Sequence, residues 1–246
     1  MFTVRSGIVS GRGHLLFGIN CQDSLRHASF EVNGEEFHVG FVCDGCGEGE
    51  RSEVGANLAS GFLTHRTEIL IKSGMKIENI SKKLFFDLIF FLQSIMNNYD
   101  IGGNSQDVKV SFIKNNLLFT VFGYVIGHEE TTIFSMGDGI ILINDDLDIK
   151  DQQNRPLYPA YHIVDKRYLA KGYTKLPGSF ETILIKTSDL DRLAIGTDAW
   201  ADELGALFSL WEQGKYFSLQ REMNVLSKKF KRFKDDAALI TVERCE

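Results

Sequence analysis

Acidic residues at the ends of apolar runs are the feature that most constrains how this chain can fold. In the stretch FVCDGCGEGE, an apolar run reaches Asp44, and the chain then enters a loop with glycines at positions 45, 47 and 49. A carboxylate that is buried at a strand end without a partner costs several kcal/mol. The fold therefore has to bring a cation to Asp44 or leave its side chain at an open edge.

The same arrangement recurs along the chain, where acidic residues stand beside apolar strands and small residues. These are Asp23 in GINCQDS, Asp138 in FSMGDGI, Asp198 in LAIGTDA, and Asp235 with Asp236 in FKDDAALITV. One strand-end Asp is a common turn former, but a set of this size indicates that the side chains converge. Converging carboxylates repel one another, and a multivalent cation relieves that repulsion.

Ligand chemistry narrows the choice of cation. Oxygen-only ligation favours Mg²⁺ or Mn²⁺ over zinc. Two such ions a few ångströms apart can lower the pKa of a water between them and present it to a phosphorus centre. Cys43 and Cys46 have the spacing of a zinc knuckle, but no second Cys pair or His pair completes four ligands. The acids therefore predict a hydrolytic site, and the two cysteines are interpreted as small residues that flank a turn.

The bulk composition excludes several functional classes. Hydrophobic residues make up 43% and charged residues 24% of the chain, which is typical of a globular protein. The net charge of -6 argues against nucleic-acid and anionic-membrane partners, which reward a basic face. The most apolar stretch, LFFDLIFFL, is interrupted by Asp87 and is too short for a membrane span of ~20 residues. With four Cys and no secretory leader, we expect a cytoplasmic protein.

Domain organisation and the first strands follow from the turn formers. No Pro-rich linker or internal repeat divides the chain, so we expect a single domain over residues 1–246. Asn33 and Gly34 stand between two alternating apolar runs, which predicts a β-hairpin. The second strand of that hairpin would deliver Asp44 directly into the glycine loop.

Two helices are predicted after this loop. The first begins at Ser52, a candidate N-cap, and ends near Gly74, and the second covers about residues 80–95. Apolar residues recur at helical spacing in both. They are Val54, Leu58, Phe62 and Ile69 in the first helix and Ile80, Leu84, Leu88, Leu92 and Ile95 in the second. We expect both stripes to cover a sheet.

The second half of the chain returns to strands. After a loop around GGNSQD, the runs NNLLFTVFGYVIG, TTIFSMG and GIILIND are separated by turns at HEE and DG, which predicts an antiparallel meander. Residues 150–180 show weak periodicity and clustered turn formers, which predicts an irregular flap. Two strands, two helices and the closing strand AALITVE follow. The sum of elements indicates an α+β fold of layered sheets and helices.

The acidic motifs, in this order, resemble those of the protein phosphatase 2C (PPM) family of metal-dependent serine/threonine phosphatases, particularly its divergent bacterial branch. The resemblance covers nearly the whole chain and rests on NCQDS, VCDGCGEGERSEVGA, FSMGDGIILI, LAIGTDAWADE and KDDAALITV. It implies a four-layer α-β-β-α sandwich of two antiparallel sheets flanked by helices. It also implies two Mg²⁺ or Mn²⁺ ions as cofactors, with a third, looser site in many bacterial members.

The resemblance assigns metal ligands position by position. Asp44 would bridge both ions, and the carbonyl of Gly45 would complete the second site. Asp198 and Asp235 would hold the first ion. Asp138 would form the third site together with Asp198. The answer it implies for Asp44 is that this strand ends on a carboxylate because two cations bind there.

Catalytic residues are carried over in the same way. Asp23 would orient metal-bound waters. The family usually has an Arg before the first acidic motif to grip the substrate phosphate, but this region reads GRGHLLFGINCQD. The divergent bacterial branch often has a His where His14 stands, so we expect His14 to act as a general acid or a phosphate contact. A loop His without a catalytic part is the alternative.

Two functions remain open from the sequence. The first is hydrolysis of phosphoserine and phosphothreonine on proteins by a metal-activated water, opposed to a serine/threonine kinase and carried out by a monomer. The second is a regulatory or binding module with the same fold and little catalysis, favoured by the missing Arg and by drift around the acids. Ala199 replaces a Gly and Gln22 replaces a Glu found in other members. No acid of the set is lost, which favours the enzyme.

Overall fold

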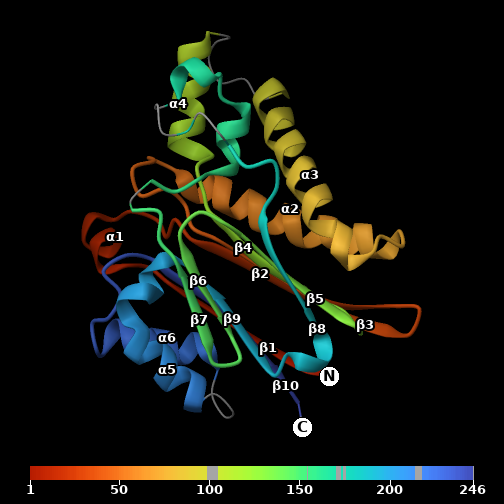
Figure 1. The fold of residues 1–246 in the computed structure, drawn as a ribbon. Helices are drawn as coiled ribbons and strands as arrows, with labels where there is room; N and C mark the ends of the chain where they lie inside the picture. The colour runs from red at the N-terminus through yellow and green to blue at the C-terminus, as the bar shows by residue number, and fades with distance from the viewer. Residues whose placement is uncertain (99–104, 154, 170–172, 174–175, 214–217, 246) are drawn as a thin grey trace.

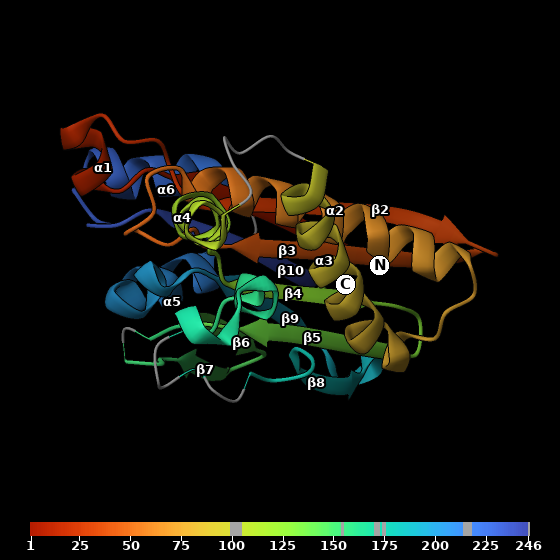
Figure 2. The same ribbon diagram turned by 90° about the horizontal axis from the view of Figure 1, so that it is seen from above.

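Two antiparallel five-stranded sheets form the centre of the molecule (Figures 1 and 2). The computed structural model describes residues 1–98, 105–153, 155–169, 173, 176–213 and 218–245. One sheet has the order β1 (Phe2–Val9), β10 (Ala237–Arg244), β9 (Arg192–Gly196), β6 (Gly139–Ile143) and β7 (Asp146–Lys150). The other has the order β2 (Ser24–Val32), β3 (Glu35–Cys43), β4 (Val121–Ile126), β5 (Glu130–Met136) and β8 (Glu181–Lys186).

Helices cover the outer faces of both sheets. Helices α2 (Ser52–Lys72) and α3 (Ile77–Asn98) lie over the sheet that contains β2 and β3, and α5 (Leu204–Gln213) and α6 (Leu219–Lys228) lie on the opposite side of the molecule (Figure 1). Large side chains such as Phe122, Tyr124 and Ile240 are buried in one cluster contributed by both sheets. The predicted four-layer sandwich of the α+β class is therefore confirmed.

The hairpin of β2 and β3 places two acids at one end of its sheet. Asn33 and Gly34 have φ angles of 54° and 84°, as a tight two-residue turn requires, so the predicted hairpin is confirmed. The register pairs Ser24 with Cys43. Asp23 and Asp44 are the next residues outward on the two strands, and so they lie at the same end of the hairpin.

Helix α2 packs on the sheet with a face other than the predicted one. Its buried residues are mostly small, and they include Gly55, Ala56, Ala59, Ser60 and Leu63. In contrast, Val54, Leu58 and Ile69 are each 39% exposed, so the predicted apolar stripe was wrong for these three residues, and only its fourth member, Phe62, packs against the core. A Cβ on Gly55 would lie 2.5 Å from the carbonyl oxygen of Asn116, which shows that close approach selects small side chains here. Ser52 begins the helix, and Arg51 rather than Ser52 occupies the N-cap position.

Helix α3 buries the predicted stripe, since Ile80, Leu84, Leu88 and Leu92 are all inaccessible to solvent and only Ile95 is half-buried. Two other helices were missed. Helix α1 (Arg12–Phe17) lies in a predicted loop, and α4 (Gln106–Asn116) lies where loop and strand were expected. The hydroxyl of Ser105 caps α4 by accepting from the backbone N–H of Val108 at 3.3 Å. Strand β4 consequently starts only at Val121.

The predicted meander was correct for β4 and β5 but wrong for β6. The turns at HEE and DG are present, yet β5 pairs with β4 and β8, whereas β6 pairs with β7 and β9 in the other sheet. The chain changes sheets at Asp138, between Gly137 and Gly139. Gly137 has a φ of 99° in this tight connection. Asp138 therefore lies where the two sheets meet.

The segment between β7 and β8 holds the residues that were predicted to form an irregular flap. Its described residues form only short 3₁₀ helices, Pro159–Ile163 and Lys166–Tyr168, while residues 154, 170–172 and 174–175 of the predicted segment lie outside the described residues. Among the described residues, no helix is both long and apolar enough to cross a membrane.

Candidate metal centre

Loops at one end of the two sheets enclose a pocket of about 510 Å³. Asp44 follows β3 of one sheet, while Asp198 follows β9 and Asp235 precedes β10 in the other sheet. Because these strand ends meet at one edge, residues far apart in sequence become neighbours. The lining of this pocket includes each residue that was predicted as a metal ligand, namely Asp44, Gly45, Asp138, Asp198 and Asp235.

Asp23 lies behind this lining. It is only 4% exposed, and its Oδ2 has no hydrogen-bond partner among the described residues. Burial raises its pKa well above the usual range, the charges of Asp236 and Asp198 raise it further, and a hydrogen bond with Thr197 lowers it. A buried carboxyl oxygen without a partner fits a site that a cation or its waters would complete.

The carboxyls of the pocket hold one another's pKa values high. The pKa of Asp44 is raised by burial first, and then by the charges of Asp23, Asp198 and Asp235. The pKa of Asp198 is raised by burial and by Asp235. Burial also raises the pKa of Asp138. Such a cluster of acids that oppose one another's ionisation, built from oxygen donors, fits hard divalent cations such as Mg²⁺ and Mn²⁺.

The backbone around Gly45 is held firmly. The Asp44 carbonyl accepts from the Thr120 backbone N–H at 2.8 Å, and Gly45 forms a bridge with Phe119. A Cβ on Gly45 would lie 2.6 Å from the carbonyl oxygen of Gln22 and 2.8 Å from Ser52 Oγ. Glycine is thus required for this close approach, which keeps the backbone of residues 44–45 at the pocket wall.

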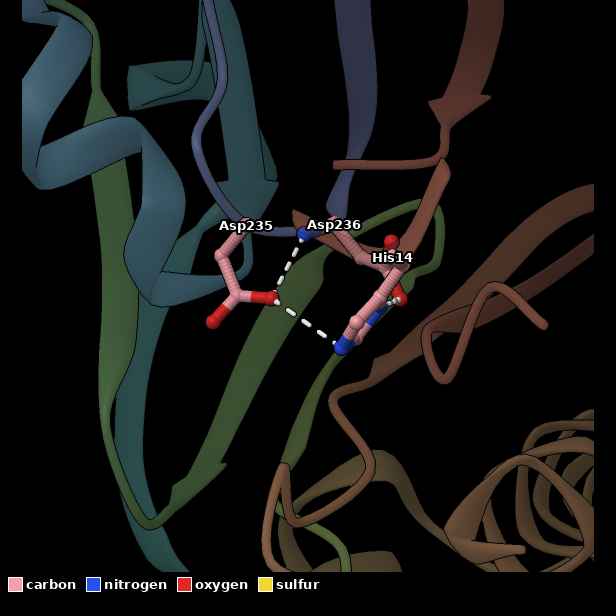
Figure 3. Close-up of side chains that lie close together, drawn as sticks. All are labelled: His14, Asp235 and Asp236. Atoms are coloured by element: carbon pink, nitrogen blue, oxygen red, sulfur yellow. Dashed lines mark hydrogen bonds and ion pairs between the residues drawn. The ribbon is translucent and has the colours of Figure 1, made fainter. Parts of the chain in front are cut away.

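His14 lies between Asp235 and Asp236 and outside the lining of the pocket (Figure 3). Its Nδ1 is 2.8 Å from Asp236 Oδ2, and its Nε2 is 4.0 Å from Asp235 Oδ1. Asp236 also accepts from the backbone N–H of Gly11 at 2.7 Å and of Gln22. This buried carboxylate therefore anchors the segment that carries His14 and Asp23 to the start of β10.

Asp236 stands among the acids beside apolar runs, but no role was predicted for it. The adjacent Asp235 carried the motif, and two neighbouring acids at the start of a strand look alike in sequence. Both residues stand just before β10, and of the two only Asp235 lines the pocket, whereas the carboxylate of Asp236 meets His14. The alternation of side chains along an extended segment was the available signal, although it did not say which of the two faces inward.

The comparison with protein families decides the classification. The model of the family described as protein phosphatase 2C matches residues 10–162. This chain belongs to the protein phosphatase 2C family. No protein with a curated description matches it by sequence.

Solved phosphatase structures share the fold along the whole chain. Serine/threonine phosphatase Stp1 from Staphylococcus aureus is 13% identical with a TM-score of 0.59, covering 100% of this chain and 96% of that chain. A bacterial serine phosphatase is 15% identical with a TM-score of 0.60, covering 99% and 98%. The catalytic domain of the serine/threonine protein phosphatase PstP, in complex with 2 manganese ions, is 12% identical with a TM-score of 0.56, covering 98% and 97%. At these identities the likeness shows the fold.

Two departures from the protein phosphatase 2C pattern have a simple structural account. Ala199 lies in the 3₁₀ helix Asp198–Glu203 and is not among the described residues with positive φ, so it needs no glycine. Gln22 donates from Nε2 to the Gly49 carbonyl at 2.8 Å and thereby ties the first motif to the glycine loop. Its Oε1 is buried without a partner among the described residues, as an acceptor for a metal-held water would be.

Proposed function

We propose that this protein hydrolyses phosphoserine and phosphothreonine on proteins and depends on Mg²⁺ or Mn²⁺. The observation that carries the proposal is the single pocket that gathers Asp44, Gly45, Asp138, Asp198 and Asp235. Membership of the protein phosphatase 2C family and the manganese-bound structure of PstP support it. The proposed substrates are phosphorylated proteins, with a serine/threonine kinase as the opposing enzyme.

The residues of the pocket would have different roles in holding the metal ions. Asp44 would bridge two ions, with the Gly45 carbonyl on one side and Asp198 with Asp235 on the other. Asp138 would provide a looser third site. When bound, the ions would supply an activated water and neutralise charge that develops on the phosphoryl group.

Protein groups beside the ligands would position and move protons. Asp23 would accept hydrogen bonds from waters through its unpartnered Oδ2. The Asp236 carboxylate accepts a hydrogen bond from His14 Nδ1–H and so orients the ring with Nε2 toward Asp235. Because His14 lies outside the lining of the pocket, a proton from Nε2 would reach the leaving alkoxide through a water.

The direct test is turnover of p-nitrophenyl phosphate by the purified protein with Mn²⁺, with Mg²⁺ and with a chelator. We expect turnover that requires metal and disappears in Asp44→Asn. Asp146→Asn, an exposed acid on β7, is the matched control and should retain activity. Hydrolysis that continues in the chelator, or that Asp44→Asn leaves intact, would refute the metal mechanism.

The second candidate function is a regulatory module that binds metal but turns over poorly. The lack of an arginine in the lining of the pocket, among the residues described, favours it. Calorimetry separates the two functions, because Mn²⁺ binding without turnover of either p-nitrophenyl phosphate or phosphoserine peptides would support the module.

A further inference from the structure

The side chains that line the pocket carry a net negative charge, which would repel an anionic substrate. Among the described lining residues, the acids are Asp44, Glu48, Asp138, Asp198 and Asp235. With only the two ions at Asp44 bound and the looser third site empty, four of these five negative charges would be offset. A phosphate monoester dianion would then enter a pocket that still repels it, unless a cationic side chain offsets the remaining charge.

Lys114 is the only cationic side chain among the described residues that line this pocket. It lies in the last turn of α4, next to Asn115. Arg12, which is closer in sequence to the first acidic motif, directs its guanidinium to the carbonyl oxygen of Lys231 at 3.5 Å and does not line the pocket. The pocket therefore draws its positive charge from the C-terminal end of α4.

The backbone at Lys114 is fixed while its ammonium is free. The Asn115 carbonyl accepts from the Arg51 backbone N–H at 2.8 Å, and the Leu118 carbonyl accepts from Cys46 at 3.0 Å. These bonds join the end of α4 to the glycine loop that carries Asp44. The Lys114 side chain is exposed and has no hydrogen bond or ion pair with any described residue. A side chain with a fixed backbone and an ammonium that has no partner is well suited to bind an anion.

We propose that Lys114 binds the phosphate group of the substrate and so serves as the phosphate-gripping cation of this chain. This inference rests on the proposed function, because it places the phosphate at the same pocket. A lysine ammonium can form charge-assisted hydrogen bonds with phosphate oxygens as a point charge, without the two-pronged geometry of arginine. The contact supplied by an Arg in other members would then come from a different element of the fold.

The experiment compares Lys114→Ala and Lys114→Arg with Lys109→Ala. Lys109 lies on the same helix but outside the lining of this pocket, so it is the matched control. With Mn²⁺ present, we expect Lys114→Ala to raise KM for p-nitrophenyl phosphate about tenfold, with a smaller effect on kcat. Lys114→Arg should restore most of the affinity, and Lys109→Ala should match the parent protein.

A second readout does not depend on turnover. Calorimetry with inorganic phosphate and the Mn²⁺-loaded protein should show about tenfold weaker binding in Lys114→Ala. The affinity for Mn²⁺ itself, measured without phosphate, should be unchanged. Phosphoserine peptides with neutral and with acidic flanks should lose affinity to the same degree if the contact is with the phosphate.

The outcomes separate this inference from the proposed function. Unchanged KM and unchanged phosphate affinity in Lys114→Ala would overturn the inference while parent turnover upheld the proposed function. A loss confined to the peptide with acidic flanks, or a change in Mn²⁺ affinity, would also overturn it. A parent protein without turnover that binds phosphate through Lys114 would uphold the inference and refute the proposed hydrolysis.

Discussion

Asp235 and Asp236 follow one another in the chain, yet their side chains do different work. The Asp235 side chain is 67% exposed and lines the pocket, whereas that of Asp236 is 2% exposed and accepts from three donors of the 11–22 segment. Burial of a carboxylate is tolerable here because its oxygens are hydrogen-bonded. Asp236 thus determines where His14 and Asp23 stand.

Asp236→Asn should destabilise the protein by about 2 to 3 kcal/mol. In either orientation of the amide, its NH2 group would face a donor, the Gly11 N–H or the Gln22 N–H with the His14 ring, so at least one buried backbone N–H would lose its acceptor. Urea unfolding monitored by circular dichroism measures the change, with Asp146→Asn as the control for loss of a surface charge. A variant as stable as the parent would show that the 11–22 segment is held by other contacts.

His14→Ala tests the role of the imidazole separately from stability. We expect kcat for phosphoserine peptides to fall by about a hundredfold if Nε2 delivers the proton to the leaving group. The fall should be smaller for p-nitrophenyl phosphate, because p-nitrophenolate leaves without needing a proton. Equal losses on both substrates would point to displacement of Asp235, and an unchanged kcat would remove His14 from the mechanism.

The acids that line the pocket could be selected from the sequence as candidate ligands because each stands beside an apolar run. Their convergence was not foreseeable from that pattern alone, since it depends on which strands share a sheet edge. The role of Asp236 could not be assigned either. The role of Asp236 depends on the direction of the chain at the start of β10. This direction is set by the pairing of β10 with β1 and β9.

At the scale of an element, α2 shows that the largest side chains do not always face the core. Its small residues allow the helix to lie close to the segment that leads into β4, where Gly55 meets Asn116 and Leu117. The same contact places the end of α4, with Lys114, at the rim of the pocket. The positions of the two long helices, α2 and α3, follow from periodicity, but the choice of the buried face of α2 follows from how close its partners come.

Gly55→Ala and Gly61→Ala form a matched pair on α2. Alanine favours a helix over glycine by roughly 1 kcal/mol, so Gly61→Ala, with nothing within 4 Å of the new Cβ, should stabilise by about 0.5 to 1 kcal/mol. Gly55→Ala should instead destabilise by about 1 to 3 kcal/mol, because its Cβ would lie 2.5 Å from a backbone oxygen.

The midpoints of urea unfolding decide between these signs. Two stabilised variants would mean that α2 can move away from the Asn116 carbonyl at little cost. Two destabilised variants would mean that Gly61 is also packed against a neighbour. Opposite signs would support a close contact that only glycine allows.

The element order was largely predictable, and the errors share a cause. Helices α1 and α4 are short, and the first has no buried residue and the second only Val110 and Ile113, so little apolar periodicity marks them. The placement of β6 beside β9 instead of β5 is a long-range pairing that local turn chemistry at Asp138 does not encode. Both errors concern information that lies outside the element itself.

At the scale of the whole molecule, the acids of the pocket lie at a junction between the two sheets. Elsewhere the sheets contact each other through apolar side chains. Asp44 comes from the sheet of β3, while Asp198 and Asp235 come from the sheet of β9 and β10. Without cations, like charges oppose one another across this junction. Bound ions would turn the same junction into a link between the sheets, so metal binding should contribute to the stability of the entire fold.

Thermal unfolding with and without Mn²⁺ tests that link. A ligand at one hundred times its Kd stabilises by about 2.7 kcal/mol, which for a chain of this size raises Tm by about 5 to 10 °C. Asp44→Asn should abolish the shift. The same variant should be more stable than the parent without metal by about 1 kcal/mol, because the folded state no longer confines that charge beside Asp23 and Asp198.

The expected gain in stability of Asp44→Asn without metal is the more discriminating part of this test. Since the pKa of Asp44 is raised on folding, its carboxyl costs stability as pH rises from the ordinary carboxyl pKa to that raised value, the cost is complete above it, and the asparagine removes it. Asp146→Asn and an NaCl control at equal ionic strength exclude a general effect of charge. An Asp44→Asn protein that is less stable than the metal-free parent would make Asp44 a structural residue, and an equal Mn²⁺ shift in both proteins would place the ion elsewhere.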